Sequence, residues 1–153
     1  MKSFPISLIS KCIVGLCLLL SSQVVASGQY NAFARSVSES IAVGSSGLII
    51  KSNDGQNWTS VNSGVTVDLF SVAWSGNIYA AVGAGGTILS SENGNLWISR
   101  SGQSTEDFVQ VLWGGQFFVA FRTGGQALTS VDGVNWQERP ATDPILSLSL
   151  IHI

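Results

Sequence analysis

The chain contains the stretch Ser52-Asn53-Asp54-Gly55-Gln56-Asn57-Trp58, and it repeats the form of this stretch twice more at a constant spacing. The later copies are Ser91-Glu92-Asn93-Gly94-Asn95-Leu96-Trp97 and Ser130-Val131-Asp132-Gly133-Val134-Asn135-Trp136. All three have the form Ser-x-Asp/Asn-Gly-x-x-Trp, which we call the box. A fixed period of about 40 residues predicts a repeat architecture.

The repeat extends beyond the boxes. At the 39-residue offset, Leu69–Trp74 aligns with Phe108–Trp113 and, more weakly, with Tyr30–Arg35. The repeat units are therefore 30–68, 69–107 and 108–146. The first unit is the most degenerate, as terminal repeats often are.

Each unit is expected to contain four strands. In the second unit the pattern predicts strands near 69–75, 77–83, 87–91 and 96–100. The segment 77–82 is almost continuously apolar, which is typical of a strand buried on both faces. Glycine-rich segments between the strands favour tight turns, and no stretch has the apolar period of a helix. We therefore predict almost no helix.

The box predicts a hairpin turn. Asp-Gly or Asn-Gly between two strands is a strong hairpin signal, and the Asp, Asn and Ser side chains can accept hydrogen bonds from nearby backbone N–H groups. The tryptophan that follows can cover the turn. We assign this structural role to Ser52, Asp54, Gly55, Trp58, Ser91, Asn93, Gly94, Trp97, Ser130, Asp132, Gly133 and Trp136.

A four-stranded unit of about 40 residues corresponds to one blade of a β-propeller, where stacked blades bury both faces of each sheet. The predicted fold is therefore all-β, a partial β-propeller of about three four-stranded antiparallel blades. Closed propellers have about four to eight blades. The sequence thus predicts the N-terminal part of a longer propeller.

The box, following a glycine-rich hairpin, resembles the Asp-box or bacterial neuraminidase repeat (BNR) of sialidase-like propellers. It is shorter, by one position, than the commonest form of that motif. Similar boxes occur in photosystem II assembly-factor propellers and in exported bacterial proteins. The resemblance covers residues 30–146 and implies an architecture rather than an activity.

The segment 1–26 resembles a secretory signal peptide. Two lysines flank a short leader, an apolar run covers 12–20, and Val24-Val25-Ala26 offers a cleavage site. A lipoprotein signal at Cys17 is the alternative. Both cysteines lie in this leader, so the rest of the chain has no thiol. We expect a secreted or periplasmic bacterial protein.

The charge pattern argues against nucleic acid as a partner. The leader holds two of the seven basic residues, which leaves five basic and nine acidic residues and a net charge of −4 in the remainder. Those basic residues form no cluster. After removal of the leader, no membrane insertion is expected.

The last segment, 148–153, has the sequence Leu-Ser-Leu-Ile-His-Ile. The codons CTG TCT CTT ATA CAC ATC, a sequencing-adaptor string, encode this sequence, and we interpret the segment as adaptor-derived. A natural apolar tail is the alternative. Because the only histidine, His152, lies in this segment, no histidine chemistry is assigned.

Four residues are candidates for binding. Arg122 stands where the other units have Gly44 and Gly83, and Arg35 stands where they have tryptophan. Sialidase-like enzymes, by resemblance, hold a substrate carboxylate with clustered arginines. Because the Phe-Arg-Ile-Pro segment of that family is absent, a solvated hairpin arginine is the preferred interpretation.

The tryptophans of the first strand are the other two candidates. Trp74 and Trp113 could line a carbohydrate-stacking surface, although their recurrence at the repeat period favours packing within the blades.

No catalytic residue, metal ligand or cofactor is predicted. By resemblance, sialidase chemistry needs a tyrosine paired with a glutamate and an acidic donor, whereas Tyr30 and Tyr79 occupy repeat-typical strand positions. The sequence favours an exported, non-catalytic propeller that binds a protein or a glycan. Two alternatives stay open: the N-terminal fragment of a sialidase-like glycoside hydrolase, and an assembly-factor-like propeller.

Overall fold

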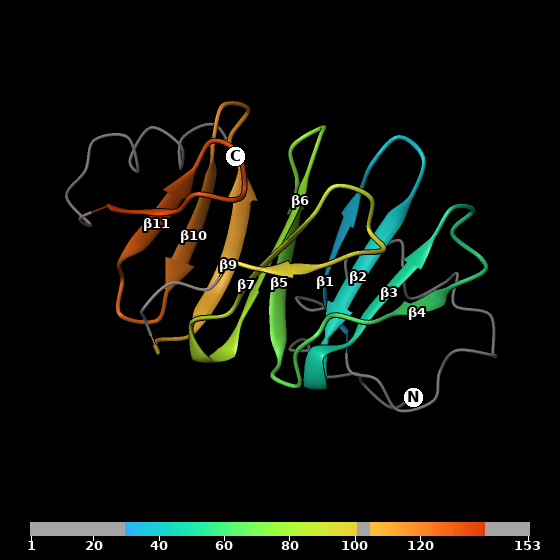
Figure 1. Ribbon diagram of the computed structural model, residues 1–153, viewed down its shortest axis with the longest axis horizontal. Helices are drawn as coiled ribbons and strands as arrows, with labels where there is room; N and C mark the ends of the chain where they lie inside the picture. The colour runs from blue at the N-terminus through green and yellow to red at the C-terminus, as the bar shows by residue number, and fades with distance from the viewer. Residues whose placement is uncertain (1–29, 101–104, 140–153) are drawn as a thin grey trace, which may run out of the picture.

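The computed structural model describes residues 30–100 and 105–139. The predicted signal peptide, the adaptor-like tail and the last residues of the third repeat unit lie outside these ranges. Twelve strands and two short 3₁₀ turns make up the described regular structure, so the all-β prediction is confirmed (Figure 1).

The strands form three separate four-stranded antiparallel sheets, one for each repeat unit. The first blade contains β1 (Tyr30–Arg35), β2 (Ser40–Gly44), β3 (Ile49–Ser52) and β4 (Thr59–Val61). The second contains β5 (Leu69–Trp74), β6 (Tyr79–Gly83), β7 (Ile88–Ser91) and β8 (Ile98–Ser99). The third contains β9 (Phe108–Trp113), β10 (Phe118–Arg122), β11 (Ala127–Ser130) and β12 (Gln137–Arg139).

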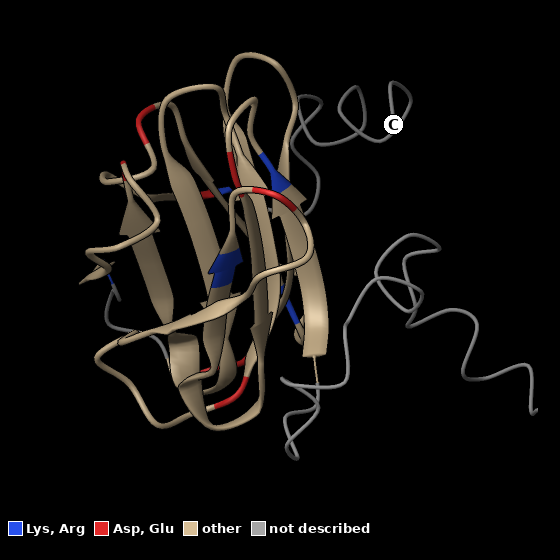
Figure 2. Ribbon diagram, turned by 90° about the vertical axis from the view of Figure 1, so that its right-hand side faces the viewer, with Lys and Arg blue, Asp and Glu red and all other residues tan. Residues whose placement is uncertain are grey.

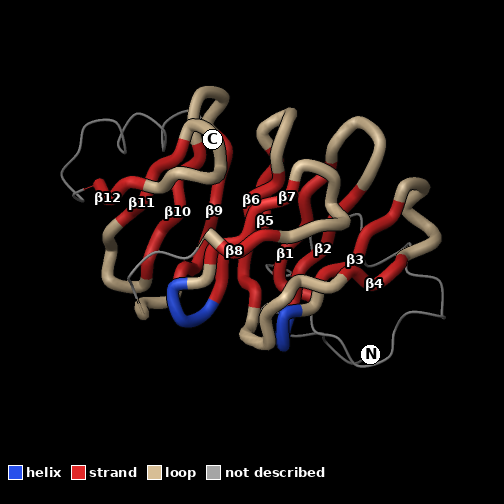
Figure 3. Tube along the Cα trace, viewed as in Figure 1, coloured by secondary structure: helices blue, strands red, loops and turns tan. Residues whose placement is uncertain are grey.

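The strands of each blade pair in sequence order, and the first strands β1, β5 and β9 lie side by side in the middle of the molecule (Figures 1 and 3). An amide–carbonyl bond joins the first two of them, because Asn31 Nδ2 donates to the carbonyl oxygen of Leu69 at 2.8 Å. A hydroxyl–carbonyl bond joins the next two, because Ser71 Oγ donates to the carbonyl oxygen of Val111 at 3.3 Å. The prediction of a partial β-propeller with three blades is confirmed.

The second strands of the first two blades are buried along their whole length. All five residues of β2 and of β6 are buried, as the continuous apolar run in the sequence predicted. However, β6 begins at Tyr79 rather than at Asn77. The hydroxyl of Ser75 accepts hydrogen bonds from the N–H groups of Asn77 and Ile78, so these two residues belong to the turn instead.

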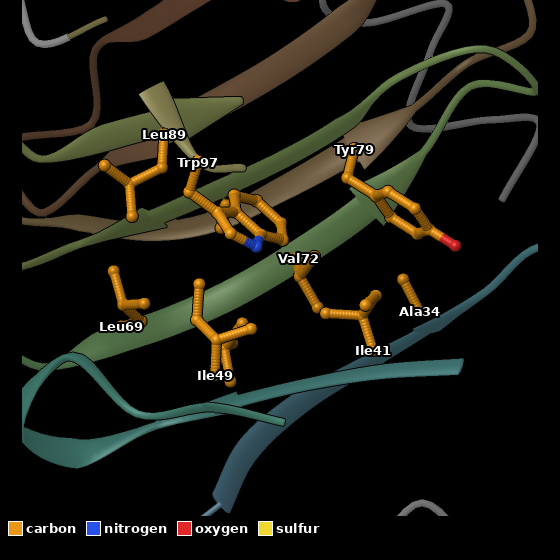
Figure 4. Packing of buried hydrophobic residues seen from close by; sticks show 10 residues of the cluster. Ala34, Ile41, Ile49, Leu69, Val72, Tyr79, Leu89 and Trp97 are labelled. Atoms are coloured by element: carbon orange, nitrogen blue, oxygen red, sulfur yellow. The ribbon is translucent and has the colours of Figure 1, made fainter. Parts of the chain in front are cut away.

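The core lies between the blades. Residues of the first and second sheets point toward one another and form one apolar cluster, shown in Figure 4. A second cluster joins the second and third sheets through residues such as Ile88, Phe108 and Phe118. Alternate residues of β6 contribute to different clusters: Tyr79 and Ala81 face the first blade, whereas Ala80 and Val82 face the third. This alternation explains why the strand is apolar throughout.

Candidate functional site

The strand directions place the four candidate residues at two opposite ends of the blades. Arg35, Trp74 and Trp113 are the last residues of β1, β5 and β9, and they therefore share one end, which we call the aromatic end. Arg122 is the last residue of β10, which runs antiparallel to β9, and so it lies at the other end. The structure does not bring the two arginines together.

Trp74 and Trp113 combine packing with partial exposure. The ring centroid of Trp74 lies 4.2 Å from that of Tyr79, and the ring of Trp113 lies 4.7 Å from that of Phe118. In each blade the second ring of the pair also lies near the box tryptophan, with the ring centroids 6.0–6.2 Å apart. Both indoles remain only half-buried. They therefore have a packing role and also contribute to the surface of the aromatic end.

The first blade lacks this aromatic triplet. Arg35 occupies the position of Trp74 and is exposed, while Ser40 occupies the position of Tyr79. Trp58 contacts Phe33 edge-on instead, at 6.4 Å. Next to Arg35, the side chain of Val37 is fully exposed in the turn between β1 and β2. The first blade thus presents a cation and an apolar side chain where its neighbours present tryptophan.

The box turns are held by their own hydrogen bonds. Asp54 Oδ1 accepts from the N–H groups of Gln56 and Asn57 at 2.8 and 2.7 Å, and Asp132 accepts from the equivalent groups at 2.9 and 2.8 Å. These bonds hold the pKa of both carboxyls well below the usual range. The indole nitrogens of Trp58, Trp97 and Trp136 donate to the box glycine carbonyls at 3.2–3.3 Å.

The middle box shows that the turn does not need a carboxylate. Asn93 Oδ1 accepts from the N–H groups of Asn95 and Leu96 at 3.0 and 3.1 Å, which are the same positions that Asp54 and Asp132 satisfy. The box acids are acceptors for their own backbone. This geometry agrees with a structural role for Asp54 and Asp132.

The box glycines also contact the preceding blade, a role that sequence reasoning missed. A Cβ at Gly94 would lie 2.8 Å from the carboxylate of Glu39, and one at Gly133 would lie 3.0 Å from Ile78. Glu39 and Ile78 are equivalent positions in the repeat, one unit apart. A Cβ at Gly55, in the first box, would meet nothing within 4 Å. The sequence feature that could have indicated this role is the glycine itself, which is present in all three boxes.

A polar pair lies between the first two blades. Among the described residues, the Tyr79 hydroxyl and Glu39 Oε2 are buried without a hydrogen-bond partner, and Lys51 Nζ is 3.7 Å from Glu39 Oε2. Burial of its hydroxyl raises the pKa of Tyr79, and the nearby Glu39 carboxylate adds to this shift. At the next interface Ile78 and Phe118 occupy the equivalent positions. A tyrosine with a raised pKa is a poor nucleophile.

The sequence predicted that Arg122 is solvated, and the structure shows that this prediction is wrong. Its side chain is only 6% exposed, and Nη1 donates to Glu138 Oε1 at 2.8 Å and to Gln126 Oε1 at 3.3 Å. The guanidinium lies over the ring of Phe108 at 5.2 Å. This arrangement belongs to the third blade, where Arg122 replaces glycine. Because its charge is paired inside the protein, Arg122 has a structural role here.

Within 30–100 and 105–139, no three His, Cys, Asp or Glu side chains come together to hold a metal ion. No helix in these ranges is long and apolar enough to cross a membrane. Figure 2 colours the positions of charged residues along the ribbon, and in this view the Lys and Arg positions of the described part are separated from one another.

The comparisons place the fold among β-propellers. No family model matches the chain, and no curated protein matches it. Solved structures do: YCF48 from Cyanidioschyzon merolae matches with a TM-score of 0.63 and 20% identity over 79% of this chain. YCF48 bound to D1 peptide matches with a TM-score of 0.62 and 17% identity over 72% of this chain. The WD40 β-propeller domain of Doa1 matches with a TM-score of 0.54 and 14% identity over 69% of this chain.

These likenesses establish the architecture of the chain. The chain spans about two-fifths of the propellers that it matches, 38–40% of their length. It contains three propeller blades, and it is similar in fold to WD40 and YCF48 propellers.

Proposed function

We propose that the protein is an exported, non-catalytic β-propeller module of the Asp-box type that binds a protein segment at its aromatic end. The observation that carries the proposal is the pair of half-buried tryptophans, Trp74 and Trp113, on adjacent inner strands. Tryptophan and arginine are enriched where proteins bind one another, because both offer large contact areas with polar tips.

The surroundings of the two tryptophans have the composition of a binding surface. Exposed residues in the turns between the first and second strands at this end include Val37, Asn77 and Gln116, which are apolar or neutral. The box turns, farther out at the same end, carry exposed carboxylates. Arg35 adds one positive charge, and no carboxylate among the described residues lies within ion-pair distance of it. An extended segment with an apolar side chain and an acidic group would match this surface.

A protein segment is a better ligand for this surface than a glycan. Stacking on a sugar needs an open aromatic face, but each indole here already packs against a neighbouring ring, of Tyr79 or Phe118. The likeness to YCF48 bound to D1 peptide supports the same choice, since that propeller holds a peptide. A glycan remains the competing ligand in the experiment below.

The glycosidase alternative has no support in the described residues. Arg35 and Arg122 lie at opposite ends of the blades, so they do not form a carboxylate clamp. Arg122 is paired with Glu138, and the hydroxyl of Tyr79 is buried with a raised pKa. The assembly-factor alternative is one form of the proposed binding function, and its test is binding of the D1 peptide.

The experiment selects ligands and then maps them. A peptide library and a glycan array are applied to the protein, and the dissociation constant of each selected ligand is measured for wild type and for R35E/V37D. Both altered side chains are exposed, so the variant should fold normally. V131D changes another exposed valine, on the outer part of the third blade, and is the matched control.

The proposal predicts peptide ligands whose affinity falls at least tenfold in R35E/V37D and stays unchanged in V131D. Selection of glycans alone, or peptides that bind both variants as they bind wild type, would contradict it.

A further inference from the structure

A hollow beside the outer strand of the second blade differs in chemistry from its counterpart in the first blade. Its volume is about 170 Å³. Its lining includes Ser90, Glu92, Leu96, Ile98 and Arg100. It lies away from the inner strands of the aromatic end, because its lining comes mainly from β7, β8 and the box between them.

The first blade has a hollow at the equivalent place. Its volume is about 250 Å³, and it is lined by the polar residues Lys51, Ser52, Asn53, Asp54, Asn57 and Thr59. The architecture of the blade therefore supplies the hollow, and the sequence sets its chemistry. Leu96 and Ile98 replace Asn57 and Thr59 of the first blade, and the third blade has Asn135 and Gln137 at these positions.

Leu96 and Ile98 are exposed although both are aliphatic. They are 65% and 43% exposed, while Trp97 between them is buried against the first blade. Leu96, Ile98 and Arg100 all line the hollow and therefore lie on one side. Blade packing does not require this apolar pair, since the other two blades are polar here. Adjacent exposed aliphatic side chains beside a hollow are typical of an interaction site.

Arg100 supplies a positive charge that is held in place. Its Nε donates to Ser90 Oγ at 2.9 Å, which fixes one edge of the guanidinium. In the described part of the chain, no carboxylate lies within 4.0 Å of this side chain, in contrast to Arg122, which pairs with Glu138. The remaining N–H groups of Arg100 can therefore donate to an external carboxylate.

We propose that this hollow is a second docking site, for an extended protein segment that carries an aliphatic side chain close to an aspartate or glutamate. The aliphatic group packs between Leu96 and Ile98, and the carboxylate pairs with Arg100. Arg100 can pair with one carboxylate of the segment, whereas Glu92, which also lines the hollow, disfavours a segment with several acidic groups. The apolar pair disfavours a free anion or a sugar. This site does not depend on the aromatic end.

The test uses a displayed peptide library on the full chain, with two matched variants. L96N/I98T gives the second blade the residues that the first blade already has, so its fold should be retained. R100Q removes the charge and keeps a hydrogen-bond donor for Ser90. Circular dichroism and thermal unfolding check both variants, and light scattering gives the oligomeric state of the wild type.

We expect enriched peptides with an aliphatic residue within about three positions of Asp or Glu. Their affinity should fall at least tenfold in L96N/I98T and in R100Q, and it should stay unchanged in R35E/V37D. The proposal would be overturned if wild type enriched such peptides no more strongly than the two variants do, provided that both variants fold. So would a set of selected peptides of which none loses affinity in L96N/I98T or in R100Q, or a wild-type dimer that L96N/I98T dissociates.

Discussion

The carboxylate of Asp68 accepts a hydrogen bond from the backbone N–H of Ser46 at 2.8 Å, and it thereby joins two blades. Asp68 precedes the first strand of the second blade, and its carbonyl oxygen accepts from the N–H of Ala84 in that blade. Ser46 belongs to the β2–β3 turn of the first blade, where it has a positive φ of 56°. Asp107 and Gly85 repeat the carboxylate bond between the second and third blades at 2.8 Å.

This bond should contribute measurably to stability. Asp68→Ala is expected to lower the free energy of unfolding by about 1 kcal/mol, the usual net value of one hydrogen bond. Asp68→Asn keeps an acceptor and should lose less. Urea unfolding measures both. Equal losses in the two variants would show that the acceptor has no role.

A methyl group at Gly83 should be strongly destabilising. Its Cβ would lie 2.0 Å from the carbonyl oxygen of Asp68, although its extended backbone suits any residue. We expect Gly83→Ala to cost about 3 kcal/mol through overpacking. Gly55→Ala, at a glycine with a positive φ of 73° and nothing near its Cβ, should cost only about 1 kcal/mol.

Thermal or urea unfolding of the two variants shows which substitution lowers the stability more. Without the clash, Gly83→Ala would stabilise the protein through the entropy of the unfolded chain, so a gain in stability would contradict the structure.

The polar pair between the first two blades should be replaceable by the apolar pair of the next interface. Glu39→Ile with Tyr79→Phe removes two buried atoms without hydrogen-bond partners among the described residues and installs the residues found at Ile78 and Phe118. We expect the double variant to be about 1 kcal/mol more stable than wild type. A double-mutant cycle should show coupling between the two positions. Additive, destabilising effects would contradict their proximity.

The box carboxylates should make stability depend on pH in the acid range. The pKa of Asp54 and of Asp132 is lower in the folded protein than in the unfolded chain, where it is about 3.9. Their contribution is therefore complete above about pH 5 and is lost as the pH falls through and below the unfolded value. Asp54→Asn with Asp132→Asn mimics the Asn93 box.

Urea unfolding across the acid range, up to near-neutral pH, measures this dependence. The double variant should lose less stability on acidification than wild type. Glu92→Gln, which changes an exposed carboxylate outside the turn's hydrogen bonds, is the control and should leave the pH slope unchanged. An unaltered slope in the double variant would refute the assignment of the low pKa to these turns.

The repeat period predicted the architecture well because it reflects local structure. The apolar run at 77–82, the glycine turns and the boxes each specify a strand or a hairpin, and all three sheets have the predicted composition. The boundary of β6 was less accurate. The hydroxyl of Ser75 caps the turn, and this side-chain bond competes with the strand ladder.

Contacts between strands and between blades were not predictable from one segment of the sequence at a time. The environment of Arg122 depends on Phe108, Gln126 and Glu138, which come together only when the sheet forms. The roles of Asp68 and Asp107 also depend on a neighbouring blade. Their equivalent positions in the repeat were visible in the sequence, but the meaning of this recurrence required the positions of the turns at Ser46 and Gly85.

The separation of the candidates into two ends likewise followed from topology. Strand order and direction place Arg35 with Trp74 and Trp113 and remove Arg122 from them. The sequence indicated the arginines and the tryptophans as separate candidates and did not place them relative to one another.

The most direct test of binding at the aromatic end is oxidative footprinting of the five tryptophans, with and without a selected peptide, read by mass spectrometry. Trp58, Trp97 and Trp136 cover the box turns and are internal references. The peptide should protect Trp74 and Trp113 from oxidation and leave the three reference tryptophans unchanged. Unchanged oxidation of Trp74 and Trp113 in the saturated complex would contradict binding at the aromatic end.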